Sequence, residues 1–231
     1  SGFKKSKIEF QDLLYDMKKI QGAEAGDGQL TPGGIQIGHG SRPVSTSKVF
    51  TTGDLVQTDE RLDIAIAGAG FFEVQMPGGF QGYTRDGSFK VSADGAVVTN
   101  EGYQVVNAIP NIGAEVSNIA ISKTGEYTLF DQQGQNIGAG QIQTTRFINP
   151  SGLQNIGGNI YQETPASGVP EQGNPGQNGF GELAQGYLEM SNVKVVEEMV
   201  NLIKAQRAYE VNSKAIQAAD EMMQRSNQIK R

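Results

Sequence analysis

A seven-residue hydrophobic repeat runs through the C-terminal part of the chain. Five large apolar residues follow this spacing without an exception: Val195, Leu202, Tyr209, Ile216 and Met223. Apolar residues at this period share one face of an α-helix, and no proline or glycine interrupts residues 187–231. The pattern therefore predicts a long helix over 191–231, with Ser191 and Asn192 as candidate N-caps.

The predicted helix is too long to be covered by a domain of this size. At 1.5 Å per residue, about 35 residues extend about 50 Å, which exceeds the diameter of a small domain. We therefore expect the apolar stripe to pack on another long helix or on another subunit, as in a coiled coil. A purely intramolecular core is the alternative. The expected subunit interface consists of Val195, Met199, Leu202, Ala205, Tyr209, Asn212, Ile216, Ala219 and Met223.

The middle of the chain has the period of β-strands. Leu62, Ile64 and Ile66 alternate with Asp63 and Ala65, and residues at every second position share one face of a strand. Turn dipeptides follow at short intervals, at 78–79, 86–87, 94–95, 101–102, 124–125 and 133–134. This spacing predicts about seven or eight short strands that form an antiparallel β-barrel or sandwich domain over 61–147.

Residues 16–60 and 149–186 show neither period clearly, and they make up most of an N-terminal segment over 1–60 and a return segment over 148–190. Both segments contain clusters of glycine and proline, which predict extended connections with short strands near 44–51 and 158–163. The expected fold class is therefore mainly β with a long C-terminal α-helix. The β domain is inserted between an N-terminal extended segment and an extended return segment that leads to the helix.

Composition narrows the possible chemistry. The 31 glycines among 231 residues fit a turn-rich β structure. The absence of cysteine excludes disulfides and thiolate sites, and the single histidine, His39, has no neighbouring ligand or orienting carboxylate. No apolar run reaches the length of a membrane span. A net charge of −6, with no basic cluster beyond Lys4, Lys5 and Lys7, argues against a nucleic-acid partner.

The short motifs that resemble active sites are better explained as structural elements. Gly68-Ala69-Gly70 lacks the third glycine of a dinucleotide-binding loop. Ser45–Lys48 has the spacing of a Ser/Lys pair, but no partner motif follows it. Asp86 and Asp94 precede glycines, as turn residues do. We therefore predict no catalytic, cofactor-binding or metal site, and a protein that is not an enzyme.

Several segments resemble one known family. They are Gly2–Ser6, Gly34–Gly40, Tyr83–Phe89, Gly186–Val193, Val196–Asn201 and Gln206–Ala215. Together they resemble the axial proteins of the bacterial flagellum, the rod and hook family, over the whole chain. Members of that family begin with a helix that precedes the Gly2-Phe3-Lys4 segment, and we expect that helix to be absent from this sequence. The linker over about 15–40 resembles the insertion of distal rod members.

The resemblance implies a structural role. It predicts a subunit that self-assembles as a homo-oligomer into an open, rigid helical tube, which surrounds the export channel and transmits motor torque to the hook. The implied partners are neighbouring proximal rod and hook proteins and the surrounding basal-body ring proteins. The implied location is the basal body in the periplasm, reached through the flagellar channel without a cleaved signal peptide.

Two alternatives stay open. The chain is another axial protein, of the proximal rod or the hook, or it is a β-domain binding module on a coiled-coil stalk.

Overall fold

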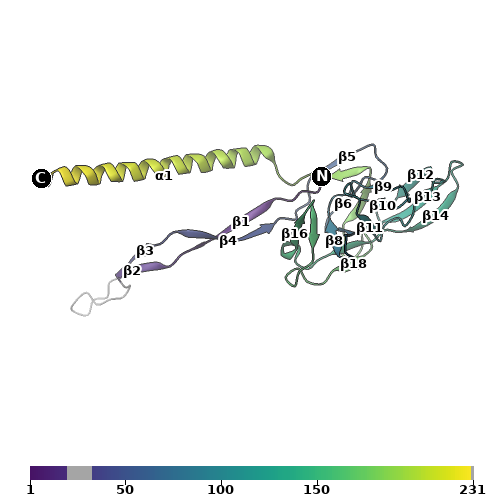
Figure 1. The fold of residues 1–231 in the computed structure, drawn as a ribbon, viewed down its shortest axis with the longest axis horizontal. Helices are drawn as coiled ribbons and strands as arrows, with labels where there is room; N and C mark the ends of the chain where they lie inside the picture. The colour runs from purple at the N-terminus through teal and green to yellow at the C-terminus, as the bar shows by residue number, and fades with distance from the viewer. Residues whose placement is uncertain (20–32, 230–231) are drawn as a thin grey trace. The chain divides into compact units, whose positions relative to one another are not determined.

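The computed structural model describes residues 1–19 and 33–229. The chain divides into two compact units, residues 1–192 and 193–231. The strands belong to the first unit and the long helix to the second (Figure 1). Mainly-β structure with one long C-terminal helix is therefore confirmed as the fold class.

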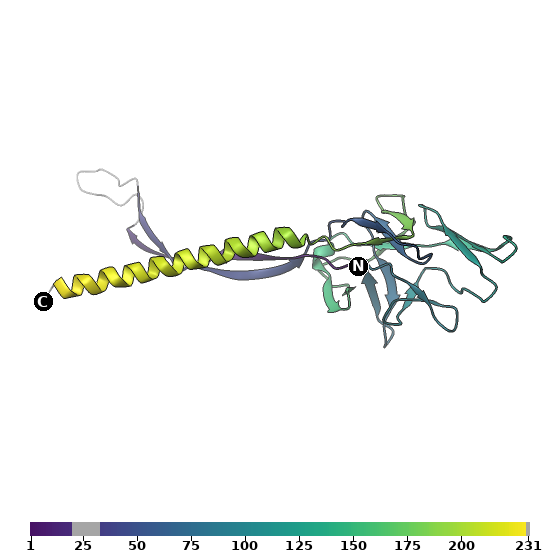
Figure 2. The same ribbon diagram turned by 90° about the horizontal axis from the view of Figure 1, so that it is seen from above.

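The N-terminal part of the first unit is a two-stranded antiparallel ribbon. Strand β1 (Ser6–Asp12) pairs with β4 (Ser41–Lys48), with a register shift between Glu9 and Phe10. Farther along the ribbon, β2 (Tyr15–Lys19) pairs with β3 (Ile35–Gly38). Both strand pairs are visible from two directions (Figures 1 and 2). Within the described residues, the segment that was expected to be extended and irregular is thus a regular hairpin.

The sequence anticipated only part of this ribbon. The strand expected near 44–51 overlaps β4, whereas β1, β2 and β3 were not expected. Residues 20–32 of the expected insertion over 15–40 lie outside the described residues.

The body of the first unit is built around an open seven-stranded antiparallel sheet. The strand order is β16-β17-β8-β7-β11-β10-β9. In chain order these strands are β7 (Phe72–Gln75), β8 (Gln81–Thr84), β9 (Lys90–Val91), β10 (Val97–Val98), β11 (Gln104–Val106), β16 (Gln154–Gly157) and β17 (Ile160–Gln162). The sheet has two edges, at β16 and β9, and so is not a closed barrel. The expected strand near 158–163 is β17.

Smaller antiparallel sheets complete this body. One has the order β12-β13-β14, and three pairs join β15 to β18, β19 to β6 and β20 to β5. Their bounds are β5 (Leu55–Gln57), β6 (Ile64–Ala67), β12 (Asn118–Ile121), β13 (Glu126–Phe130), β14 (Asn136–Gln141), β15 (Thr144–Arg146), β18 (Glu171–Gly173), β19 (Glu182–Gln185) and β20 (Tyr187–Glu189), and a 3-10 turn spans Pro150–Gly152. The return segment therefore supplies strands to these sheets instead of only passing over them.

Two hydrophobic clusters fill the body. The larger contains the alternating residues Ile64 and Ile66 together with Phe72, Val74 and other apolar side chains. Ala65, between the two isoleucines, is also buried, so both faces of β6 are covered at this point. The smaller is aromatic, and its rings meet edge to face: Phe50, Phe71, Tyr83, Phe147 and Tyr161. Edge-to-face pairs add to the stabilisation that burial alone provides.

The two tyrosines of the aromatic cluster predict alkaline unfolding. Burial raises the pKa of the Tyr83 hydroxyl, with a further contribution from Glu73 and Glu163, and burial also raises the pKa of Tyr161. The unfolded chain releases these protons near pH 10 and the folded chain does not, so stability present below that pH is lost above it. We expect the free energy of unfolding to fall by up to about 1.4 kcal/mol per pH unit for each tyrosine. Urea titrations between pH 9 and 11 measure this slope, which Tyr83→Phe should reduce; an unchanged slope in that variant would contradict the assignment.

The second unit is helix α1 (Val195–Ile229), 35 residues long. Glu197 and Glu198 lie in its first turn, where negative charge complements the helix dipole. None of the described helices is long and apolar enough to cross a membrane. The helix begins three residues later than Asn192, which was expected to cap it.

Candidate functional site

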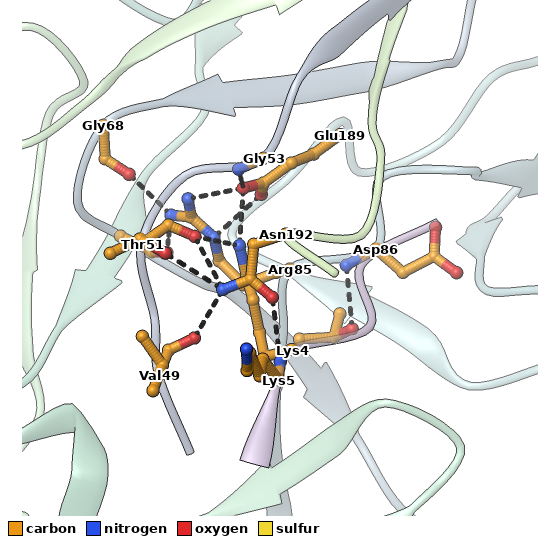
Figure 3. A network of polar contacts seen from close by, with 12 residues as sticks. Lys4, Lys5, Val49, Thr51, Gly53, Gly68, Arg85, Asp86, Glu189 and Asn192 are labelled. Atoms are coloured by element: carbon orange, nitrogen blue, oxygen red, sulfur yellow. Dashed lines mark hydrogen bonds and ion pairs between the residues drawn. The ribbon is translucent and has the colours of Figure 1, made fainter. Parts of the chain in front are cut away.

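A buried carboxylate joins three distant parts of the first unit. Glu189, at the end of β20, accepts a hydrogen bond from Lys4 Nζ to Oε1 at 2.6 Å and one from Arg85 Nε to Oε2 at 3.0 Å. Arg85 Nη2 also reaches Oε1 at 3.3 Å, and the backbone N–H of Gly53 donates to the same oxygen at 2.9 Å. We call Lys4, Gly53, Arg85 and Glu189 the Glu189 cluster (Figure 3).

The guanidinium of Arg85 is fully engaged on its other side. Its Nη1 donates to the carbonyl oxygens of Gly68 at 2.7 Å and Gly70 at 2.6 Å. Both glycines have positive φ, +127° and +145°, and glycine adopts such backbone conformations at little cost. The Gly68-Ala69-Gly70 segment thus presents two carbonyls to one arginine, which gives this motif a structural role in place of the dinucleotide-binding role that was rejected.

Lys4 is enclosed as completely as its partner. The side chains of Lys4 and Glu189 are both 0% exposed, and Lys4 Nζ also donates to the carbonyl of Thr51 at 2.8 Å. Burial lowers the pKa of the Lys4 ammonium, against the opposing effect of the hydrogen bond and charge of Glu189. A buried ammonium is tolerated only when it is paired and hydrogen-bonded, as it is here.

A second set of hydrogen bonds, from Asn192, lies beside the cluster. The side-chain oxygen of Asn192 accepts from the backbone N–H of Lys5 at 2.8 Å, and its amide nitrogen donates to the Val49 carbonyl at 2.8 Å and to Thr51 Oγ1 at 3.0 Å (Figure 3). The expectation that Asn192 caps the helix is wrong. Its side-chain amide instead forms hydrogen bonds with Lys5, just before β1, and with Val49 and Thr51, just after β4.

The three charged residues of the cluster come from three of the segments that carry the family resemblance. Lys4 lies in Gly2–Ser6, Arg85 in Tyr83–Phe89 and Glu189 in Gly186–Val193. Sequence reasoning noted these segments but did not bring their charged residues together. One signal could have pointed to the cluster in advance: each of these segments contains a charged residue that the strand and turn patterns do not require.

The residues singled out from the sequence occupy other places. All nine residues of the expected subunit interface on α1 have exposed side chains, including Leu202 at 60% and Ile216 at 64%. His39 is exposed. Asp86 accepts hydrogen bonds from the N–H and hydroxyl of Ser88, as a turn residue does. Within the described residues, no group of three or more histidine or acidic side chains is arranged to hold a metal ion.

The chemistry of the Glu189 cluster is that of a structural joint. Both carboxylate oxygens carry donors, and the two cations are directed at this carboxylate and at backbone carbonyls. A general acid or base needs a free position toward a substrate proton. The arrangement instead fixes the relative places of the chain segments that supply its members.

Gly53 provides a direct test of this packing. A Cβ at Gly53 would clash with the backbone oxygen of Met190, whereas a Cβ at Gly113 would meet no atom within 4 Å. We expect Gly53→Ala to lower the free energy of unfolding by about 3 kcal/mol, because it pushes β20 away from the Gly53 N–H, and Gly113→Ala to change it by less than about 0.5 kcal/mol. Denaturant unfolding of both variants measures the difference, and equal effects would show that the close approach is not required.

Known proteins place these features in one family. Residues 184–229 match the C-terminal domain family of the flagellar basal body rod FlgEFG proteins, and residues 65–129 match the D1 domain family of the flagellar hook proteins FlgE/F/G. The flagellar basal-body rod protein FlgG of Buchnera aphidicola subsp. Acyrthosiphon pisum is 46% identical over 99% of this chain and 88% of its own length. The chain belongs to the flagellar basal-body rod protein family. The expected family is thereby confirmed.

Other members of the basal-body rod family from distant bacteria are also similar over the full chain. The flagellar basal-body rod protein FlgG of Borreliella burgdorferi is 45% identical over 100% of this chain and 88% of its own length. The protein of the same description from Bacillus subtilis is 36% identical over the same shares. The matched C-terminal region contains Glu189, Asn192 and all of α1. The chain is therefore a structural component of the flagellar rod in the basal body.

Proposed function

We propose that the protein is a subunit of the flagellar distal rod that self-assembles into a rigid helical tube. The observation that carries the proposal is the exposed apolar stripe along α1, in a chain whose relatives are rod proteins. Met199, Leu202 and Tyr209 are each at least 60% exposed. Contiguous apolar surface of this kind marks an interaction site, and a helix of this length has room for contacts with more than one neighbour.

The stripe is proposed to be the subunit interface of the tube. In an open helical assembly each subunit uses two different surfaces, so that contacts repeat without closing a ring. We propose that the helices form the inner layer around the export channel and that the β domain, about residues 61–147, lies outside. Residues 1–60 and 148–190 would connect these layers. The resulting shaft would transmit motor torque to the hook.

The proposed partners and location follow from the same role. The ends of the tube would contact proximal rod and hook proteins, and its outer surface would face the basal-body ring proteins. Such a tube would lie in the periplasm, and its subunits would travel through the flagellar channel without a cleaved signal peptide. The sequence gives no reason to include nucleic acid, a cofactor or membrane insertion.

Electron microscopy tests the assembly. The chain is concentrated stepwise, and each sample is imaged. Tubes that lengthen with concentration are the expected result. A discrete dimer or trimer at every concentration would contradict the rod proposal and would favour the second candidate, a β-domain binding module on a coiled-coil stalk, which the same exposed stripe also permits. If the chain entered mixed assemblies only in the hook or only in the proximal rod, it would be another axial protein and not a distal rod subunit.

A further inference from the structure

In the part of the chain that the structure describes, two ion pairs have both partners buried. Both of them belong to the Glu189 cluster. Lys4–Glu189 has both side chains at 0% exposure, and Arg85–Glu189 has them at 2% and 0%. The other ion pairs described are largely exposed, as in Lys123–Glu182, where the exposures are 82% and 57%. Among the described residues, the ion pairs with both partners buried therefore lie where the hairpin joins the β body, whereas the buried carboxyl groups of Asp63 and Glu73 are hydrogen-bonded to uncharged side chains.

Stability alone does not explain such a cluster. Removing two charges from water costs several kcal/mol per ion, and replacing a buried pair with uncharged residues is often neutral or stabilising. The cluster also holds two cations and one anion, so one positive charge is offset only by the carbonyls of Thr51, Gly68 and Gly70. Hydrogen bonds to charged groups are, however, strongly directional.

The groups that these hydrogen bonds connect lie at the base of the hairpin. Lys4 is two residues before β1, and its own carbonyl accepts from Lys48 Nζ, at the end of β4, at 3.0 Å. The backbone N–H of Gly2 donates to the Glu189 carbonyl at 3.0 Å, and Val49 donates to Lys5. Arg85 follows β8 of the seven-stranded sheet. One carboxylate thus connects both strands at the hairpin base to the main sheet.

The contacts that can fix the direction of the ribbon lie at its base, where Asn192 and Ser151 add hydrogen bonds to those of the Glu189 cluster. The side chains of Ile8, Phe10 and Val44 are 54%, 68% and 57% exposed, so no described layer covers them. An isolated two-stranded hairpin is only marginally stable in water, and its direction depends on its base.

We propose that the Glu189 cluster is a positioning device that fixes the angle at which the β1–β4 hairpin leaves the β body. Lys4 and Glu189 are its positioning residues. The cluster sets a geometry and is not the main source of stability of the body. This inference concerns the single chain and does not depend on whether the protein assembles.

Removing the central pair while conserving charge separates these roles. The double substitution Lys4→Met with Glu189→Gln leaves the cluster at its original net charge of +1. With the glutamine oxygen in the place of Oε1 it can accept from Gly53 N–H and Arg85 Nη2, whereas its NH2 group takes the place of Oε2 and ends the hydrogen bond from Arg85 Nε. The matched control is Lys123→Met with Glu182→Gln, the same pair of changes at an exposed ion pair.

The chain allows a clean distance measurement because it contains no cysteine. Cysteines introduced for spin labels at Thr46 on the hairpin and at Gln133 on the β13–β14 turn report the hairpin direction through the distribution of label distances. In the Lys4→Met/Glu189→Gln variant we expect that distribution to broaden about twofold. Because Arg85 loses its counter-charge there, the thermal midpoint of the body falls as well, so the distances are measured at a temperature at which far-UV circular dichroism shows the body to be folded. The control variant should change neither.

Two results would overturn the proposal. One is a distance distribution as narrow as that of the unsubstituted chain, and the other is a broadening that appears only together with unfolding of the body. Should the double variant fail to fold, Lys4→Met alone keeps the bidentate Arg85–Glu189 pair and is measured in the same way. A narrow distribution in that folded variant would equally overturn the proposal.

Discussion

Replacing Glu189 with leucine is expected to lower the free energy of unfolding of the first unit by about 3–5 kcal/mol. The substitution leaves Lys4 and Arg85 enclosed without a counter-charge, and it removes the acceptor of the Gly53 N–H. Breaking a buried pair from one side is much more costly than removing both partners, because the remaining charge cannot reach water. The chain contains no tryptophan whose fluorescence could report unfolding. The loss is therefore measured by denaturant titration followed by far-UV circular dichroism.

Glu171→Leu is the control for this substitution. Glu171 forms an ion pair with Arg146 at 2.8 Å, and the two side chains are 58% and 33% exposed. Exposed pairs contribute about 0–1 kcal/mol, so the control should lose no more than that. If Glu189→Leu cost as little as Glu171→Leu, the cluster would have to be open to solvent and its structural role would be wrong.

Introducing aspartate at Leu202 or Ile216 is expected to abolish assembly and leave the first unit intact. Both side chains are exposed in the single chain, so a charge there costs the monomer little, whereas burial of an unpaired carboxylate in a subunit contact is strongly unfavourable. Sedimentation and electron microscopy measure assembly of the chain, and thermal unfolding measures the stability of the β domain. The expected outcome is loss of tubes with an unchanged thermal midpoint.

Ala218→Asp provides the matched control for the helix stripe. Ala218 lies two positions beyond Ile216, which places it on the other side of an α-helix. We expect this variant to retain assembly better than Ile216→Asp. If Leu202→Asp also abolished the cooperative thermal unfolding of the β domain, the stripe would be part of the core of the single chain, which is the alternative that the sequence left open.

The parts of the fold that could be predicted are those with a long or alternating apolar pattern. Helix α1, 35 residues long, was predictable because its apolar stripe repeats without an exception from Val195 to Met223. Strand β6 was predictable because Ile64 and Ile66 alternate and lie in the buried core. The hairpin lacked this signal. All seven residues of β1 are exposed, and β4 contains Pro43 among polar residues, so no buried face imposed a period on the sequence.

The Glu189 cluster could not be predicted for a different reason. Its charged members, Lys4, Arg85 and Glu189, lie far apart in the sequence, and each was consistent with a solvated side chain. The antiparallel pairing of β20 with β5 accompanies the close approach of Gly53 to Glu189, and the hydrogen bond from the Gly2 N–H to the Glu189 carbonyl brings the Lys4 segment to the same place. The misassigned N-cap at Asn192 has the same origin, because a local rule competed with partners more than 140 residues away.

The separation of Lys4 and Glu189 along the chain affects the order of folding. The two residues that bond at 2.6 Å are 185 positions apart, and contacts of such long range form late because closing a long loop is entropically costly. A chain synthesised from its N-terminus has no counter-charge for Lys4 until its last fifth has emerged. Until then the hairpin base stays undocked, and a chain that stops before residue 189 never docks it.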